Sequence, residues 1–209
     1  MLEVRDLCCI RGERLLFADV NFSLSTGALL YIEGPNGSGK TTLQRTLCGL
    51  FTPEKGGIWW KGEEIDALDE EYTRDVLYLG HLNGIKGELT ALENLRFAAV
   101  LDGDEISDHA LNNALDRLGL SGYEDLPTKV LSQGQKRRVA LARLLLSNAR
   151  MWVLDEPFTA LDVAAVDLLQ TMIADHISDG GMVVLTTHQE VALTSGQIQR
   201  LKLSHPKTC

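Results

Sequence analysis

Short runs of apolar residues recur along the chain and predict buried strands. The first covers 28–32, and two others end in polar residues, at 151–157 (MWVLDEP) and at 181–188 (GMVVLTTH). Nearly unbroken apolar runs of this length are typical of parallel strands that are covered on both faces. The spacing of apolar residues also predicts a helix over about 132–147 and another helix after Asp162. Alternating helices and apolar strands predict an α/β fold with a mostly parallel sheet at its core.

The segments around these strands follow other patterns. Residues 1–24 alternate short apolar runs with turn sequences, and residues 56–62 (GGIWWKG) form another short run between glycines. We therefore expect an antiparallel β part near the N-terminus. Helical spacing begins at Thr90, which can form a capping box with Glu93, and a second helix is expected to begin at Ser107. These helices would form an insert between the first parallel strand and the later ones.

One loop carries the first candidate chemistry. Residues 33–42 read EGPNGSGKTT, which fits the phosphate-binding pattern G-x-x-x-x-G-K-[ST] and lies between a predicted strand and a predicted helix. Glycines allow backbone N–H groups to face an anion, and the positive end of the helix dipole points to the same place. Lys40 adds a cation for the β- and γ-phosphates of a nucleotide, and the Thr41 hydroxyl is suited to Mg²⁺. The residues expected to bind the nucleotide are Gly34, Pro35, Asn36, Gly37, Ser38, Gly39, Lys40, Thr41 and Thr42.

Two acidic residues end the predicted strand at 151–154. Asp155 and Glu156 would lie at the carboxyl end of a buried strand, where open α/β sheets bind ligands. Asp155 can hold the Mg²⁺ that Thr41 also contacts, and Glu156 can polarise the water that attacks the γ-phosphate. Taken alone, two acids in this position are more typical of a solvated turn. The phosphate-binding loop is what favours the catalytic interpretation.

A third segment reads LSQGQKRRVALARLLL. Ser132 and Gln135 fit a capping box, which accounts for an ordinary helix start. An ordinary helix start does not explain Gly134 in the first turn, because glycine lowers helix stability. Glycine does let the backbone approach an anion closely. The segment therefore predicts a second phosphate site. Since one triphosphate does not need both sites of one chain, a site shared between two copies is the natural hypothesis.

Composition limits the possible partners. The chain has 209 residues, 44% of them hydrophobic, and a formal net charge of −9. That negative charge repels polyphosphates, so we expect no general binding of nucleic acid. No apolar run approaches the roughly 20 residues that span a bilayer, and the charged N-terminus MLEVRDLCC does not fit a signal peptide. The chain is therefore expected to stay on the side of the membrane where it is synthesised.

At this point the sequence resembles the ATP-binding-cassette (ABC) ATPases over essentially its whole length. The motifs GPNGSGKT, LSQGQ, WVLDEP, FTALD and TTH occur in the order found in that family. The resemblance implies one ABC ATPase domain over 1–209, with a helical subdomain at approximately 85–145. It also implies a head-to-tail dimer, in which Ser132 and Gly134 of one copy close over the γ-phosphate held by Lys40 of the other. Asp162 would then lie at the dimer interface, and His188 would contact the γ-phosphate and help to hold the catalytic water.

Two positions depart from the family pattern. Where the family usually has a glutamine that contacts Mg²⁺, this chain has His81, which can offer one hydrogen bond from a neutral imidazole. Where an aromatic residue usually stacks on adenine, the chain has Arg11. A guanidinium plane can also stack on a base, and a solvated arginine in a turn is an equally good explanation.

Finer features are similar to the ATP-binding subunits of the cytochrome c maturation system. They are Gly80-His81 with GIKGELTALENL, LSQGQKRRVALARL, LDEPFTALD and TTHQ. This resemblance implies a peripheral protein at the cytoplasmic face of the bacterial inner membrane, which works with separate integral membrane subunits. ATP hydrolysis would drive haem handling or release of a haem-loaded chaperone, with haem met only through partners. The alternatives are the ATPase subunit of another ABC transporter and a cassette that senses nucleotide without transport.

Overall fold

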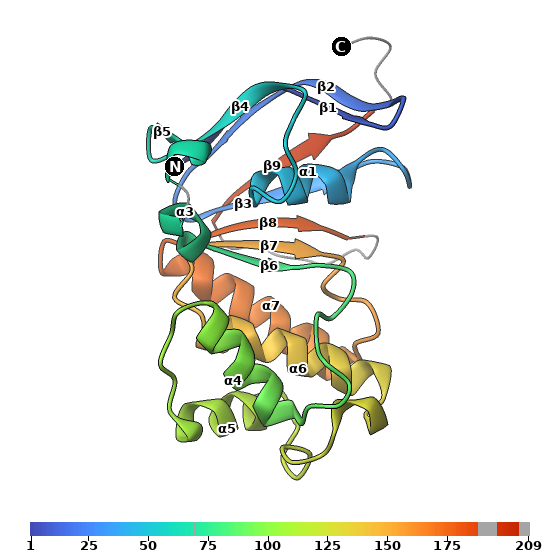
Figure 1. The fold of residues 1–209 in the computed structure, drawn as a ribbon, viewed down its shortest axis with the longest axis vertical. Coiled ribbons are helices and arrows are strands. Elements are labelled where there is room, and N and C mark those ends of the chain that lie inside the picture. The colour runs from blue at the N-terminus through green and yellow to red at the C-terminus, as the bar shows by residue number, and fades with distance from the viewer. Residues whose placement is uncertain (69, 188–195, 205–209) are drawn as a thin grey trace. The chain divides into compact units, whose positions relative to one another are not determined.

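The described part of the chain divides into two folded units (Figure 1). The computed structural model describes all residues except 69, 188–195 and 205–209. The first unit contains Met1–Tyr78, Ala149–Pro157 and Ala174–Cys209, and the second contains Leu79–Asn148 and Phe158–Ile173. None of the described helices is both long enough and apolar enough to cross a membrane.

The N-terminal segments of the first unit form an antiparallel sheet in the order β2-β1-β4-β5. Strands β1 (Leu2–Arg11) and β2 (Arg14–Leu24) make a hairpin, and β4 (Lys55–Trp60) pairs with the other edge of β1. The short β5 (Glu63–Glu64) completes the sheet. Apolar side chains on one face of these strands are buried, as the alternating sequence pattern predicts. The expected antiparallel β part is therefore confirmed.

A five-stranded sheet has the order β6-β7-β8-β3-β9. Its strands are β6 (Val76–Leu79), β7 (Met151–Asp155), β8 (Met182–Thr186), β3 (Ala28–Glu33) and β9 (Gln197–Lys202). The pairs β7–β8, β3–β8 and β3–β9 are parallel, so their carboxyl ends share one edge of the sheet. All residues of β7 and β8 are buried, which explains their unbroken apolar sequences.

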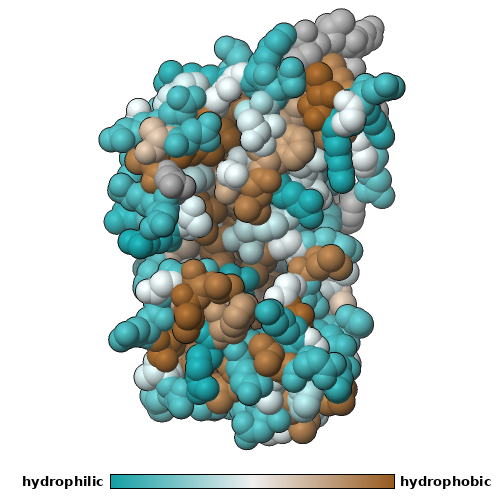
Figure 2. Space-filling model, in the orientation of Figure 1, coloured by the Kyte–Doolittle hydropathy of each residue, from teal (hydrophilic) through white to brown (hydrophobic). Residues whose placement is uncertain are grey.

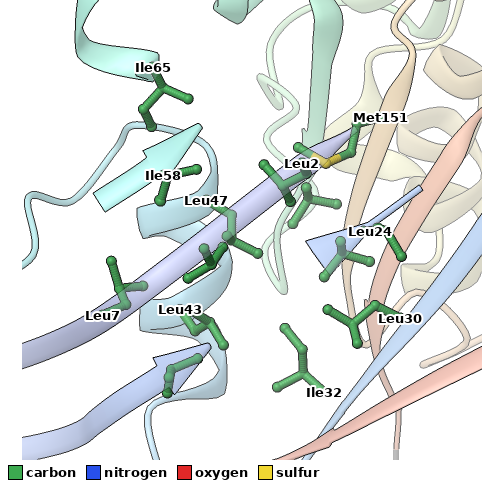
Figure 3. Close-up of a cluster of buried hydrophobic side chains, with 14 of the residues drawn as sticks. Leu2, Leu7, Leu24, Leu30, Ile32, Leu43, Leu47, Ile58, Ile65 and Met151 are labelled. Atoms are coloured by element: carbon green, nitrogen blue, oxygen red, sulfur yellow. The ribbon is translucent and has the colours of Figure 1, made fainter. Parts of the chain in front are cut away.

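Helix α1 (Lys40–Leu47) lies between the two sheets of the first unit (Figure 1). Its buried leucines belong to a hydrophobic cluster to which strands of both sheets contribute (Figure 3). The members labelled in the close-up are Leu2, Leu7, Leu24, Leu30, Ile32, Leu43, Leu47, Ile58, Ile65 and Met151. Because α1 begins at the end of the phosphate-binding loop, this packing holds that end of the loop in place.

The second unit is helical. Helices α4 (Ala91–Leu101), α5 (Asp108–Arg117) and α6 (Gln133–Leu146) pack on one another. The short η1 (Thr128–Val130) precedes α6, and α7 (Val163–Ser178) begins in this unit and ends in the first. The capping box of Thr90 and Glu93 and the helix start at Ser107 are both confirmed.

Five described elements were not predicted from the sequence. They are the short helices α2 (Ile65–Leu68) and α3 (Glu70–Asp75), the short elements β5 and η1, and the edge strand β9. In β9 no residue is fully buried, so its sequence lacks the apolar run that identifies the inner strands. The predicted α/β class with a mostly parallel sheet is otherwise confirmed.

Candidate nucleotide-binding site

The phosphate-binding loop requires glycine at two positions where the backbone is tightly enclosed. A Cβ added to Gly34 would lie 2.6 Å from Ser38 Oγ and 2.8 Å from the Leu203 carbonyl oxygen. Gly39 has φ +96°, and its Cβ would lie 2.9 Å from Phe17 Cδ1. Side chains at these positions would therefore displace the loop, while glycine keeps its backbone accessible to an anion.

The groups around this loop suit a polyphosphate. Gly39 is the N-cap of α1, and no side chain of the described residues caps that helix, so its positive end remains open. Lys40 Nζ donates hydrogen bonds to the carbonyl oxygens of Gly34 (2.8 Å) and Pro35 (3.4 Å), which holds the ammonium group at the loop. The fully buried Ser38 hydroxyl has no hydrogen-bond partner among the described residues. Open donors beside a cation fit the phosphates of ATP.

Asp155 lies next to this loop because β7 and α1 pack together in the first unit. Thr41 Oγ1 donates a hydrogen bond to Asp155 Oδ2 at 2.8 Å, and Gln44 Nε2 donates one to the Leu154 carbonyl oxygen at 2.8 Å. A hydroxyl and a carboxylate are hard oxygen donors of the kind that Mg²⁺ prefers. The described residues contain no group of three or more His, Cys, Asp and Glu arranged to hold a metal. The donor set therefore fits an ion that is held by one or two protein groups together with substrate phosphates.

Glu156 follows Asp155 with a left-handed backbone, at φ +50°. Its backbone N–H donates to Thr186 Oγ1 at 3.0 Å, and the Thr186 hydroxyl donates to Asp155 Oδ1 at 2.8 Å. Sequence reasoning did not single out Thr186. A hydroxyl residue at the end of a predicted strand could have pointed to it. Its contact with Asp155 could be inferred only from the β7–β8 register, which pairs Asp155 with Thr186.

A tyrosine lines the same part of the first unit. Burial raises the pKa of the Tyr78 hydroxyl, and the negative charge of Asp155 raises it further, while the positive charge of Arg45 acts in the opposite direction. Tyr78 is therefore neutral at physiological pH and adds no second negative charge near Asp155.

The β1–β2 hairpin presents two arginines opposite each other. Arg11 is exposed and pairs across the hairpin with Arg14, whose Nη2 donates to the Gly37 carbonyl oxygen at 3.2 Å. The predicted base-stacking residue therefore lies on the hairpin whose other arm contacts the loop. Arg14 was not predicted, because its contact depends on the hairpin register.

The remaining candidates lie in the second unit. The predicted capping box is confirmed: Gln135 N–H donates to Ser132 Oγ at 3.2 Å, and Ser132 N–H donates to Gln135 Oε1 at 2.9 Å. A Cβ on Gly134 would lie 3.0 Å from the Ala160 carbonyl oxygen, so the helix start is closely packed there. Ser132 is exposed, as is His81 in the segment after β6.

Asp162, in the FTALD segment, is held by other residues of the second unit. A backbone hydrogen bond from Ala165 lowers the pKa of this carboxyl, and Arg138 lowers it further through an ion pair of 2.5 Å. The residue therefore remains ionised.

The predicted site residues thus fall into three groups. Gly34–Thr42, Asp155 and Glu156 come together in the first unit, with Arg11 on the hairpin beside them. Ser132, Gly134, Gln135 and His81 belong to the second unit. The predicted γ-phosphate contact His188 lies outside the described residues.

A glycine-rich loop that starts a helix, a lysine at that loop and carboxylates at the ends of parallel strands define a P-loop nucleotide-binding protein. Comparisons with known proteins narrow this class. The family model described as "ABC transporter" matches residues 17–159. The chain therefore belongs to the ABC transporter family, as an ATP-binding cassette, and it is an ABC-type ATPase.

Individual relatives agree with this assignment. The cytochrome c biogenesis ATP-binding export protein CcmA of Nitrosospira multiformis is 53% identical over 97% of this chain and 98% of its own length. The protein of the same name from Dechloromonas aromatica is 54% identical over 97% of this chain and 100% of its own length. A bacterial ABC transporter cassette solved as a dimer is 27% identical, with a TM-score of 0.82, over 97% of this chain and 94% of that one. The predicted cassette fold is confirmed.

Proposed function

We propose that the chain is the ATP-hydrolysing motor subunit of a membrane complex for cytochrome c biogenesis. The observation that carries this proposal is identity above one half, over nearly the full length of both chains, to proteins named for that process. ATP hydrolysis by this subunit would drive haem handling or release of a haem-loaded chaperone. Haem itself would be bound by partner subunits.

Each group of the first unit has a role in this proposal. The loop residues bind the triphosphate, and Lys40 neutralises charge on its β- and γ-phosphates. Thr41 and Asp155 would hold Mg²⁺, whose positive charge would stabilise the negative charge that develops on the phosphate oxygens. Glu156 polarises the attacking water, and His188 is proposed to contact the γ-phosphate. Arg11 is proposed to stack on the base.

The second unit would act on the nucleotide of another copy. Ser132, Gly134 and Gln135 form the capped start of α6, and Ser132 is exposed. We propose that these residues close over the γ-phosphate bound by the partner copy in a head-to-tail dimer. The similar cassette that was solved as a dimer supports the pairing of two copies. His81 would contact Mg²⁺ in place of the usual glutamine.

An exposed apolar face of α4 supports attachment to a membrane partner. Phe97, Val100 and Leu101, at spacings of three and four residues, are 41%, 67% and 70% exposed. Brown apolar side chains gather over this part of the surface in Figure 2, among polar ones. Acidic residues outnumber basic ones over 85–125, whereas cytoplasmic loops of membrane proteins are rich in Lys and Arg. We propose that separate integral membrane subunits hold the chain at the cytoplasmic face of the bacterial inner membrane.

The proposal is tested by deleting the gene in its host and measuring haem-stained c-type cytochromes. The wild-type gene should restore them, and Glu156→Gln should not, although both proteins accumulate equally. Normal cytochromes in the deletion strain would contradict the role in cytochrome c biogenesis and would favour another transporter.

A further inference from the structure

Thr186 is a buried hydroxyl residue at the carboxyl end of β8. Its side chain is 0% exposed and makes two hydrogen bonds, both to the pair of acids that ends β7. A hydroxyl can donate one hydrogen bond and accept others at the same time. Here it donates to Asp155 Oδ1 at 2.8 Å and accepts the Glu156 backbone N–H at 3.0 Å.

The first of these bonds fixes the rotation of a carboxylate. Asp155 has Oδ2 toward the Thr41 hydroxyl at 2.8 Å and Oδ1 toward Thr186. Each oxygen therefore has its own direction, and Oδ2 is the one that faces the loop. Without the Thr186 hydroxyl, Asp155 Oδ1 would lose a donor and the carboxylate could turn away from Thr41.

The second bond holds the backbone of Glu156 in place. Glu156 has φ +50°, a conformation that costs a non-glycine residue free energy and persists only when other contacts maintain it. The bond from its N–H to Thr186 Oγ1 is one such contact. A single hydroxyl thus ties the backbone of Glu156 to the side chain of Asp155.

We propose that Thr186 is a positioning residue for ATP hydrolysis, which orients Asp155 toward Mg²⁺ and fixes the backbone from which Glu156 extends. The inference rests on the roles proposed for these two acids. Groups that orient metal ligands typically change metal affinity or activity by 10- to 100-fold when they are removed. Thr186 acts through its hydroxyl, so serine should replace it and valine, which has the same shape, should not.

The test compares Thr186→Val and Thr186→Ser in the full-length chain. A fluorescent ATP analogue is titrated with excess Mg²⁺ and with EDTA, and the ratio of the two dissociation constants measures the contribution of Mg²⁺. Thr186→Val should reduce that ratio by about 10-fold and leave the affinity in EDTA within about twofold of wild type. Thr186→Ser should restore the ratio. The ATPase kcat should follow the same order, with a smaller change in KM.

Thr128→Val is the matched control. Thr128 is also 0% exposed, and its hydroxyl donates to the Lys86 carbonyl oxygen at 2.8 Å within the second unit. This variant should lose stability without a change in the Mg²⁺ ratio. If Thr186→Val does not fold, the pair Thr186→Ser and Thr186→Ala decides, because these two variants both lack the methyl group and differ only in the hydroxyl.

Several outcomes contradict the inference. A Mg²⁺ ratio for Thr186→Val equal to wild type would show that the hydroxyl does not orient Asp155. Equal defects in the serine and valine variants would mean that packing matters and the hydroxyl does not. If Asp155→Asn removes the effect of Mg²⁺ on affinity while Thr186→Val retains it, the metal role of Asp155 stands. Only the positioning role of Thr186 then fails. If wild type shows no Mg²⁺ effect, the proposed metal role of Asp155 fails as well.

Discussion

The two units of the chain differ in how far their candidate residues are buried. In the first unit, Thr41, Asp155, Glu156 and Thr186 are joined by hydrogen bonds, and Asp155 is only 3% exposed. In the second unit, Ser132 is exposed, and large apolar side chains such as Val100 lie on the surface. We propose that the first unit binds a nucleotide by itself. We propose that the second unit acts through surfaces that meet other molecules, so hydrolysis should depend on assembly whereas nucleotide binding should not.

The largest effect should come from Glu156→Gln, which separates binding from hydrolysis within the first unit. Loss of the carboxylate that polarises water should lower the ATPase rate by about 10²- to 10⁴-fold. Nucleotide affinity should be retained, and a dimer should accumulate with ATP in size-exclusion chromatography. Glu71→Gln, at an exposed glutamate, should behave as wild type. Unchanged turnover in Glu156→Gln would remove this residue from the mechanism.

Lys40→Ala should show that binding belongs to the first unit. The loss of charge-assisted hydrogen bonds to the phosphates should weaken ATP binding by roughly 10- to 100-fold or more in a calorimetric titration of the isolated chain. Lys55→Ala, at an exposed lysine of β4, is the control. An affinity equal to that of wild type would contradict the phosphate role of Lys40.

Gly134→Ala should affect the second unit alone. Its Cβ would approach the Ala160 carbonyl oxygen to 3.0 Å, which should shift the helix start proposed to meet the partner's nucleotide. We expect ATPase activity of the assembled complex to fall roughly tenfold. ATP binding by the isolated chain should not change. Gly87→Ala is the matched control, because its Cβ would make an ordinary contact with Lys129 at 3.5 Å. Weaker ATP binding by the isolated Gly134→Ala chain would contradict the proposal that the first unit alone binds the nucleotide.

The smallest predicted effect is one on stability in the first unit, away from the candidate site. His176 stacks on Trp152 with ring centroids 3.8 Å apart and planes 7° apart, and burial lowers the pKa of the imidazole below its ordinary value of 6.5. The unfolded chain therefore binds a proton at higher pH than the folded chain does. The contribution of His176 to stability is complete above about pH 6.5 and declines as the pH falls below it.

His176→Phe keeps an aromatic stack that cannot titrate. Between pH 7.5 and 5.5 its Tm should fall less than that of wild type, by on the order of 2 °C, in thermal unfolding followed by circular dichroism. Parallel losses of Tm in the two proteins would mean that His176 titrates alike in the folded and unfolded chains.

Features encoded within short segments were predictable from the sequence. The apolar runs of β3, β7 and β8, the capping boxes and the glycine-rich loop each follow from local physical rules. Features that depend on register were not. Thr186 reaches Asp155 only because β8 pairs with β7. Arg14 reaches Gly37 only because the β1–β2 hairpin closes near the loop. The half-exposed segment of β9 is a strand only because it pairs with β3.

We expect one ATP molecule to be held by the phosphate-binding loop of one copy and the Ser132 helix start of another. Differently tagged chains carrying Asn36→Cys and Ser132→Cys, both at exposed positions, can be mixed in a Glu156→Gln background and treated with a short thiol crosslinker. Crosslinks between copies should form with ATP and Mg²⁺ and disappear with ADP. A dimer that forms with ATP and yields no such crosslink would contradict this expectation.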